Sequence, residues 1–171
     1  KEKRAGYTIY ISSCEYARDL EAPPAMLQGK TIYIRQESVR RFLWEKIEEW
    51  RWNRKKQAMD HALACYAFEI DMNSALERMT ENETATMILH ELGEGLAGEK
   101  LGPDWQKMLA TFSRSKAEIM VRAVRDILAD CLSTLPGLLA SNNTASLHFY
   151  FANFTGMRKH LFPEALEAYR R

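Results

Sequence analysis

Residues 80–100 read TENETATMILHELGEGLAGEK, and this stretch predicts a long amphipathic helix. Thr80 and Glu83 have the Ser/Thr-x-x-Glu spacing of a capping box, which satisfies free N–H groups at the start of a helix. At about 100° per residue, one side of the helix is apolar and the opposite side is polar. The apolar side is formed by Ala85, Ile88, Leu89, Leu92 and Leu96. Because Gly102-Pro103 follows, we expect the helix to end at about residue 100.

The segments on either side of this helix have a similar pattern. Residues 38 to about 72 contain no Pro or Gly, and their apolar side chains recur close to helical spacing. A third helix is expected from residue 103 to about residue 135, where Pro136-Gly137 ends it. Shorter helices are expected at residues 147–154 and from Pro163 onward. The sequence therefore predicts a mainly α domain, with three long helices followed by shorter C-terminal ones.

The first 35 residues differ from the rest of the chain. Two runs rich in β-branched and aromatic residues, 7–11 and 31–34, predict two short paired strands. Such a pair is marginal by itself, so it should pack on the helices or join a sheet from elsewhere. We therefore expect a small β-hairpin-like element in residues 1–35 and a helical domain in residues 36–171. Because the chain begins at Lys1 rather than Met, we also expect it to be part of a longer protein.

Composition and charge narrow the classes of function. Of the 171 residues, 46% are hydrophobic and 27% are charged, an ordinary balance for one globular domain. The net charge of +1 gives no overall field that would recruit nucleic acid or an anionic membrane. The longest apolar runs are far too short to span a bilayer. We therefore expect neither a nucleic acid nor a membrane partner, and the oligomeric state stays open.

The cysteines indicate the cellular compartment. Cys14, Cys65 and Cys131 are odd in number and widely separated, and they form no Cys-x-x-Cys pair. This pattern favours reduced thiols over a disulfide framework or a zinc ribbon. We therefore expect a cytoplasmic protein.

The polar side of the helix at residues 80–100 carries the best candidates for chemistry. His90 and Glu94 are four residues apart, so their side chains stack one turn from each other and can share a cation. The small residues Gly93 and Ala97 beside them would let another element approach closely. Metal binding is therefore a reasonable hypothesis for this side of the helix.

Residues 88–94, Ile-Leu-His-Glu-Leu-Gly-Glu, resemble the H-E-x-x-H helix of the zinc metallopeptidases, or zincins. In that family both histidines bind zinc, and the glutamate between them is the general base for the zinc-bound water. The resemblance implies that His90 is a ligand and Glu91 the base, with Glu94 at the position of the second histidine. Zinc is the expected divalent metal, and a carboxylate at that position also suits iron or manganese.

One branch of the zincins takes its third ligand from a downstream helix that reads E-x-x-x-D, where the Asp supports a zinc-binding His. Asp126 and Asp130 have the same spacing on the third predicted helix. The resemblance implies that Asp126 binds the metal and that Asp130 holds His90 in the required tautomer. Arg122 and Arg125 are close in sequence and offer these carboxylates structural salt bridges instead.

Other combinations of residues stay open. His61 and Glu69 lie on the apolar stripe of the first predicted helix and are alternative ligands for a non-hydrolytic carboxylate–histidine site in a helical bundle. His148 and His160 lie among aromatic and basic residues and are expected to be structural. The first hypothesis is a zinc-dependent hydrolase, with a peptide as the substrate that the resemblance implies. The alternatives are a non-hydrolytic metal-binding bundle and a metal-free helical interaction domain.

Overall fold

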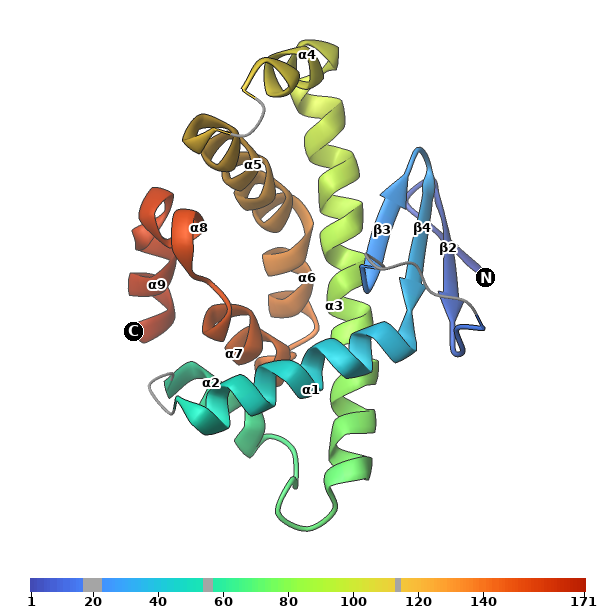
Figure 1. The fold of residues 1–171 in the computed structure, drawn as a ribbon, viewed down its shortest axis with the longest axis vertical. Helices are drawn as coiled ribbons and strands as arrows, with labels where there is room; N and C mark the ends of the chain where they lie inside the picture. The colour runs from blue at the N-terminus through green and yellow to red at the C-terminus, as the bar shows by residue number, and fades with distance from the viewer. Residues whose placement is uncertain (17–22, 54–56, 113–114) are drawn as a thin grey trace.

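The chain is mainly α-helical, with a small sheet at its N-terminal end (Figure 1). This computed structural model describes residues 1–16, 23–53, 57–112 and 115–171. The order of the sheet is β1-β2-β4-β3, with β2 and β4 parallel and both outer pairs antiparallel. The strands are β1 (Glu2–Arg4), β2 (Tyr7–Ser12), β3 (Ala25–Gln28) and β4 (Thr31–Arg35).

The two strands predicted from the sequence are β2 and β4, and they pair directly, with Ile9 opposite Ile32. The prediction of a hairpin-like pair was wrong because these two strands run parallel. The hairpins in this sheet are instead β1–β2 and β3–β4, whose two-residue turns contain Gly6 with φ +81° and Gly29 with φ +58°. The sequence of β3 is AMLQ, which has no β-branched or aromatic residue to indicate a strand.

The first predicted long helix is divided into two. α1 (Gln36–Trp52) and α2 (Gln57–Ala64) are separate helices, and turns follow α2 before the next helix begins. The predicted helix also covers residues 54–56, which lie outside the described residues. Each helix buries an apolar face of its own, represented by Leu43 in α1 and Leu63 in α2. Helical periodicity therefore continues across the break and cannot reveal it.

The central helix α3 (Met72–Leu101) begins well before the predicted capping box. Asp71 caps it, since its carboxylate accepts hydrogen bonds from the N–H groups of Asn73 and Ser74. Thr80 lies inside the helix, and its hydroxyl donates to the Leu76 carbonyl at 2.7 Å. The capping-box prediction was wrong because a threonine hydroxyl can be satisfied by the preceding helical turn as well as by a cap.

The third predicted helix is interrupted as well. It consists of α4 (Pro103–Thr111), α5 (Lys116–Ala129), a π-helical turn (Asp130–Thr134) and α6 (Leu135–Ala140). Residues 113–114 lie outside the described residues. Helical structure also continues beyond the predicted stop at Pro136-Gly137. The predicted C-terminal helices are present, as α7 (Thr144–Ala152) and α9 (Pro163–Arg170), and α8 (Gly156–Leu161) lies between them.

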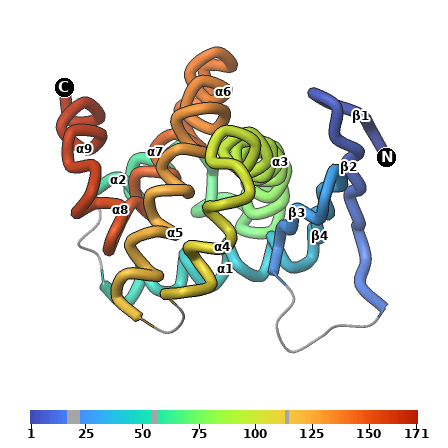
Figure 2. The backbone as a smooth tube through the Cα atoms, turned by 90° about the horizontal axis from the view of Figure 1, so that it is seen from above, coloured from blue at the N-terminus to red at the C-terminus, as the bar shows by residue number. Residues whose placement is uncertain are grey.

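Two glycines allow α3 to pack closely on both sides. Figure 2, which looks along α3, shows the sheet on one side and the later helices on the other. A Cβ atom on Gly93 would lie 2.3 Å from the Ala129 carbonyl oxygen, and one on Gly95 would lie 2.2 Å from the Tyr7 hydroxyl. Glycine is therefore needed at the first contact, which is with backbone, while a Cβ at the second would displace the Tyr7 ring. The Gly93 contact brings the polar side of α3 against the junction of α5 and the π turn.

Within the described residues, no helix is both long and apolar enough to span a membrane.

Candidate metal and acid–base site

The predicted site residues His90, Glu94, Asp126 and Asp130 meet where α3 packs on α5 and the π turn. The His90 Nε2 atom lies 3.8 Å from Glu94 Oε1, one helical turn along α3. His90 Nδ1 lies 2.9 Å from Asp130 Oδ1, across the helix contact. Asp126 reaches the same group through Arg125, whose Nη2 atom is 3.7 Å from Asp126 Oδ1.

Asp130 is the most completely bonded member of this group. Asp130 is only 1% exposed. Its Oδ2 atom accepts hydrogen bonds from the Tyr150 hydroxyl at 2.9 Å and from Arg158 at 3.2 Å. Because both oxygens are engaged, the carboxylate holds the His90 ring in one orientation, with Nε2 directed to the Glu94 side. The arrangement is that of a histidine oriented by a carboxylate.

The pKa values of this pair follow from these contacts. Burial raises the pKa of Asp130, but the hydrogen bond with His90, the charge of His90 and the Tyr150 hydroxyl outweigh it, so the pKa is lowered. Burial lowers the pKa of His90. The hydrogen bond with Asp130 and the negative charges of Asp130 and Glu94 outweigh burial, so the pKa of His90 is raised. The pair therefore favours an ionised Asp130 beside a His90 that binds its proton more tightly.

A guanidinium lies between the two carboxylates that were predicted as ligands. Arg125 Nη2 donates to Glu94 Oε1 at 2.8 Å and lies near Asp126. The Arg125 Nε atom is buried and has no hydrogen-bond partner among the described residues. Arg122, the other arginine expected nearby, pairs instead with Glu118 on its own helix at 2.8 Å. The structural salt bridge left open by the sequence is therefore present, and Arg125 makes it.

Glu91, the predicted base, is 7% exposed. Burial, together with the charge of Glu94, raises the pKa of Glu91 to about 7. His90, the backbone N–H of Leu27 in β3 and Arg125 act more weakly in the opposite direction. Glu91 is therefore a proton-binding group between α3 and the edge of the sheet, next to the His90 contact.

The fit of a divalent metal depends on Arg125. No three His, Cys, Asp or Glu side chains within the described ranges are arranged to hold a metal ion. The donor set of one imidazole and two carboxylates nevertheless suits a divalent cation. The Arg125 guanidinium supplies positive charge at those carboxylates and has one unsatisfied N–H group. The types of donor thus suit a metal, but Glu94 and Asp126 are paired with Arg125, which a metal would have to displace.

An open pocket of about 600 Å³ adjoins the site, between the sheet, α3, α4 and α5. Glu94 and Arg125 line it, so the Glu94–Arg125 ion pair is the part of the charged site that faces this space. Its other wall carries Lys30, whose ammonium forms an ion pair with Glu99 of α3. This volume lies within the range of small-ligand sites.

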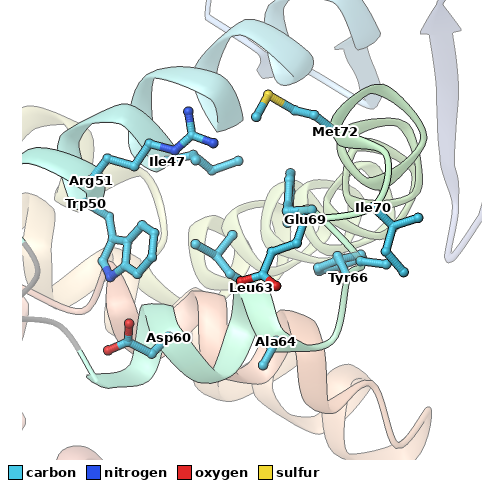
Figure 3. A pocket seen from close by; sticks show the side chains of 12 residues that line it. Ile47, Trp50, Arg51, Asp60, Leu63, Ala64, Tyr66, Glu69, Ile70 and Met72 are labelled. Atoms are coloured by element: carbon cyan, nitrogen blue, oxygen red, sulfur yellow. The ribbon is translucent and has the colours of Figure 1, made fainter.

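The alternative ligands do not join this site. His61 packs edge-on against His148, with ring centroids 5.2 Å apart, in a different pocket. Glu69 lines a third pocket beneath α1, where Figure 3 shows it beside Leu63 and Tyr66. The structure therefore places these two residues away from each other as well as from His90.

Two contributors to the site were missed by sequence reasoning. Tyr150 in α7 and Arg158 in α8 both bond Asp130. Tyr150 lies in an aromatic run and Arg158 in a basic one, and neither has a spacing that links it to Asp130. An alignment of coupled positions could have found them, but a single sequence holds no such signal.

No curated protein and no solved structure matches this chain. Two family models do match it. Residues 1–35 match the N-terminal domain, and residues 40–171 the C-terminal domain, of a family of unknown function, DUF6866. All the residues that form the charged site fall in the second match. The chain therefore belongs to the DUF6866 family.

Proposed function

We propose that this protein is a metal-dependent hydrolase of zincin-like design, active in the cytoplasm. His90, Glu94 and Asp126 would hold the metal, with zinc as the first choice and iron or manganese as alternatives. The observation that carries the proposal is the 2.9 Å contact between Asp130 and His90 Nδ1. A histidine that gives this nitrogen to a carboxylate offers its other nitrogen to a metal.

In such a site, Asp130 and Glu91 would have different roles. Asp130, held by Tyr150 and Arg158, would fix the tautomer of neutral His90 in which Nδ1 donates and Nε2 carries the lone pair. Glu91 offers a carboxylate that would accept the proton of a water held beside it. A bound divalent metal would supply a Lewis acid for that water and for a substrate carbonyl.

Arg125 would regulate access to the ligands. Its guanidinium competes for Glu94 and Asp126, so a metal binds only if the side chain leaves them. Arg125 lines the open pocket, which gives its side chain space to move. The same pocket is the proposed place for the substrate, for which a short peptide is the first candidate.

One observation favours a second function, a metal-free helical interaction domain. The Arg125–Glu94 ion pair at 2.8 Å neutralises a proposed ligand without any metal. In that case the network would hold α3 against α5, and His90 would contribute to stability alone.

Metal titration of the tag-free protein, by calorimetry with Zn²⁺ and with Mn²⁺, separates these functions. We expect Arg125→Met to bind metal about tenfold more tightly than the parent protein, because the competing charge is gone. Arg122→Met, on the same helix but paired with Glu118, is the matched control and should bind as the parent does. If neither the parent nor Arg125→Met binds metal, the metal-free domain is the correct description.

Hydrolysis is tested separately, with a pool of fluorogenic peptides. Glu91→Gln should keep the metal affinity of the parent and lose peptide cleavage, because an amide cannot accept the proton of the water. His90→Ala should lose both. A Glu91→Gln protein that still cleaves peptides would rule out the proposed base, and a parent protein that binds metal without cleaving any peptide would point to a non-hydrolytic metal site.

A further inference from the structure

A second open pocket, of about 810 Å³, lies between α2, α7 and the C-terminal helices. The ionisable side chains on its wall include His61, His148, Lys159 and Arg170, and no Asp or Glu lines it within the part of the chain that the structure describes. The whole chain carries 24 basic and 23 acidic residues, so a wall without a carboxylate departs from its average composition. This pocket is therefore locally electropositive in a nearly neutral protein.

Aromatic rings form the rest of the wall, and they are held in place. Tyr169 stacks on Phe151, with centroids 4.3 Å apart and planes at 22°. The Tyr169 hydroxyl lies 2.8 Å from His148 Nδ1, which ties the stack to the histidine pair. Phe154 also lines the pocket. The arrangement is thus a preformed aromatic surface beside two charged side chains, Lys159 and Arg170, and two histidines.

The two histidines add a reason for an anion to bind here. The His61 and His148 rings lie with centroids 5.2 Å apart. Burial and the charge of His61 both lower the pKa of His148, so the pair resists double protonation. A negative group beside both rings would relieve this repulsion.

We propose that this pocket binds a planar aromatic anion. Its ring would pack against the wall formed by Phe151 and Tyr169, and its phosphate or carboxylate would meet the histidine pair and Lys159. Aromatic rings supply apolar area and favourable stacking, and the basic side chains select the charge. This site is separate from the His90 site, which lies between α3 and α5, and it does not depend on the proposed hydrolase.

The four histidines of the chain make a direct test by NMR of the imidazole groups in the whole protein. Phenyl phosphate and indole-3-acetate are the two probes, and they distinguish a phosphate from a carboxylate ligand. We expect at least one of them to shift His61 and His148 while His90 and His160 stay unchanged. Phenol and inorganic phosphate, which carry the ring or the charge alone, should bind about tenfold more weakly.

Three other outcomes would overturn the proposal. They are an absence of shifts up to millimolar probe, shifts of His160 without the other two, and inorganic phosphate binding as well as phenyl phosphate.

Substitutions in the pocket wall test which side chains contact the probe. Lys159→Gln and Tyr169→Leu should each weaken the better probe about fivefold, through lost charge and lost ring area. Lys107→Gln, an exposed lysine on α4, is the charge control and should bind as the parent does. Tyr169→Phe keeps the ring and should stay within about twofold of the parent, which separates ring loss from a folding defect. Parent-like binding by both Lys159→Gln and Tyr169→Leu would exclude this pocket.

Discussion

Glu83 and Asp130 are both buried carboxyls that face the same contact between α3 and the later helices, yet their charges are controlled in opposite ways. Glu83 is 2% exposed, its Oε1 atom has no hydrogen-bond partner among the described residues, and burial raises its pKa to about 7. The hydroxyls of Ser146 and Thr86 oppose this increase only weakly. Asp130 is equally buried but has three partners, and its pKa is lowered. Partners, more than burial, therefore decide whether a carboxyl in this interior is ionised.

The largest expected effect is the loss of the Asp130 carboxylate. Asp130→Ala should reduce the free energy of unfolding by about 3–5 kcal/mol, because it leaves His90 and Arg158 without their buried partner. Urea denaturation at pH 7 measures it. Asp126→Ala, on the adjoining turn, removes a half-buried carboxylate with one long contact and should cost less than about 1 kcal/mol. If the two variants lost equal free energy of unfolding, the Asp130 network would contribute no more to stability than the half-buried Asp126 carboxylate.

A smaller effect is expected when the helix contact at Asp130 is pushed apart. Gly93→Ala should destabilise the protein by about 1–3 kcal/mol, since its Cβ would meet the backbone of Ala129, which cannot move aside alone. Gly98→Ala is the matched control, because no atom lies within 4 Å of its added Cβ. That variant should be stabilised by up to about 1 kcal/mol through helix propensity. Thermal unfolding of both variants measures these changes in stability. A Gly93→Ala protein as stable as the parent would contradict the close packing at Ala129.

The third prediction concerns pH and Glu83. A carboxyl with a higher pKa in the folded chain binds its proton more tightly there, so stability falls as the pH rises from about 4.5 to about 7. Glu83→Gln should remove the part of this dependence that Glu83 contributes, while Glu91, whose pKa is also raised to about 7, keeps its own part. The variant should be more stable than the parent at pH 8 by about 3 kcal/mol, with little difference at pH 4.5. The exposed Glu81→Gln should leave the profile unchanged. Unfolding curves across this pH range would refute the prediction if Glu83→Gln kept the slope of the parent.

The sequence predicted local relationships well and distant ones poorly. His90 and Glu94 lie one turn apart on a helix, so their proximity follows from spacing alone. The approach of Asp130 to His90 was expected from the family resemblance and is present as a contact. Arg125 was one of two arginines named for salt bridges, but the choice between them depends on the rotation of α5. Tyr150 and Arg158 come from helices whose positions no local pattern specifies.

Errors in the fold have the same origin. Periodicity reports which face of a segment is buried, and that face can continue through a break in the helix. For this reason the interruptions between α1 and α2 and between α4 and α5 were not predicted. The parallel pairing of β2 with β4 was missed because strand composition does not encode direction.

The π turn at Asp130–Thr134 shows how one amino acid can set the phase of a whole helical rod. Here the N–H of Leu135 reaches back to the carbonyl of Asp130, five residues before it, where an α-helix would reach back four. Deleting Cys131, which is exposed, would restore an uninterrupted α-helix and rotate everything after it by about 100°. Asp130 would still face His90, but Leu138 would leave the core. The extra residue thus lets one continuous rod present a charged side to α3 at Asp130 and an apolar side to the interior two turns later.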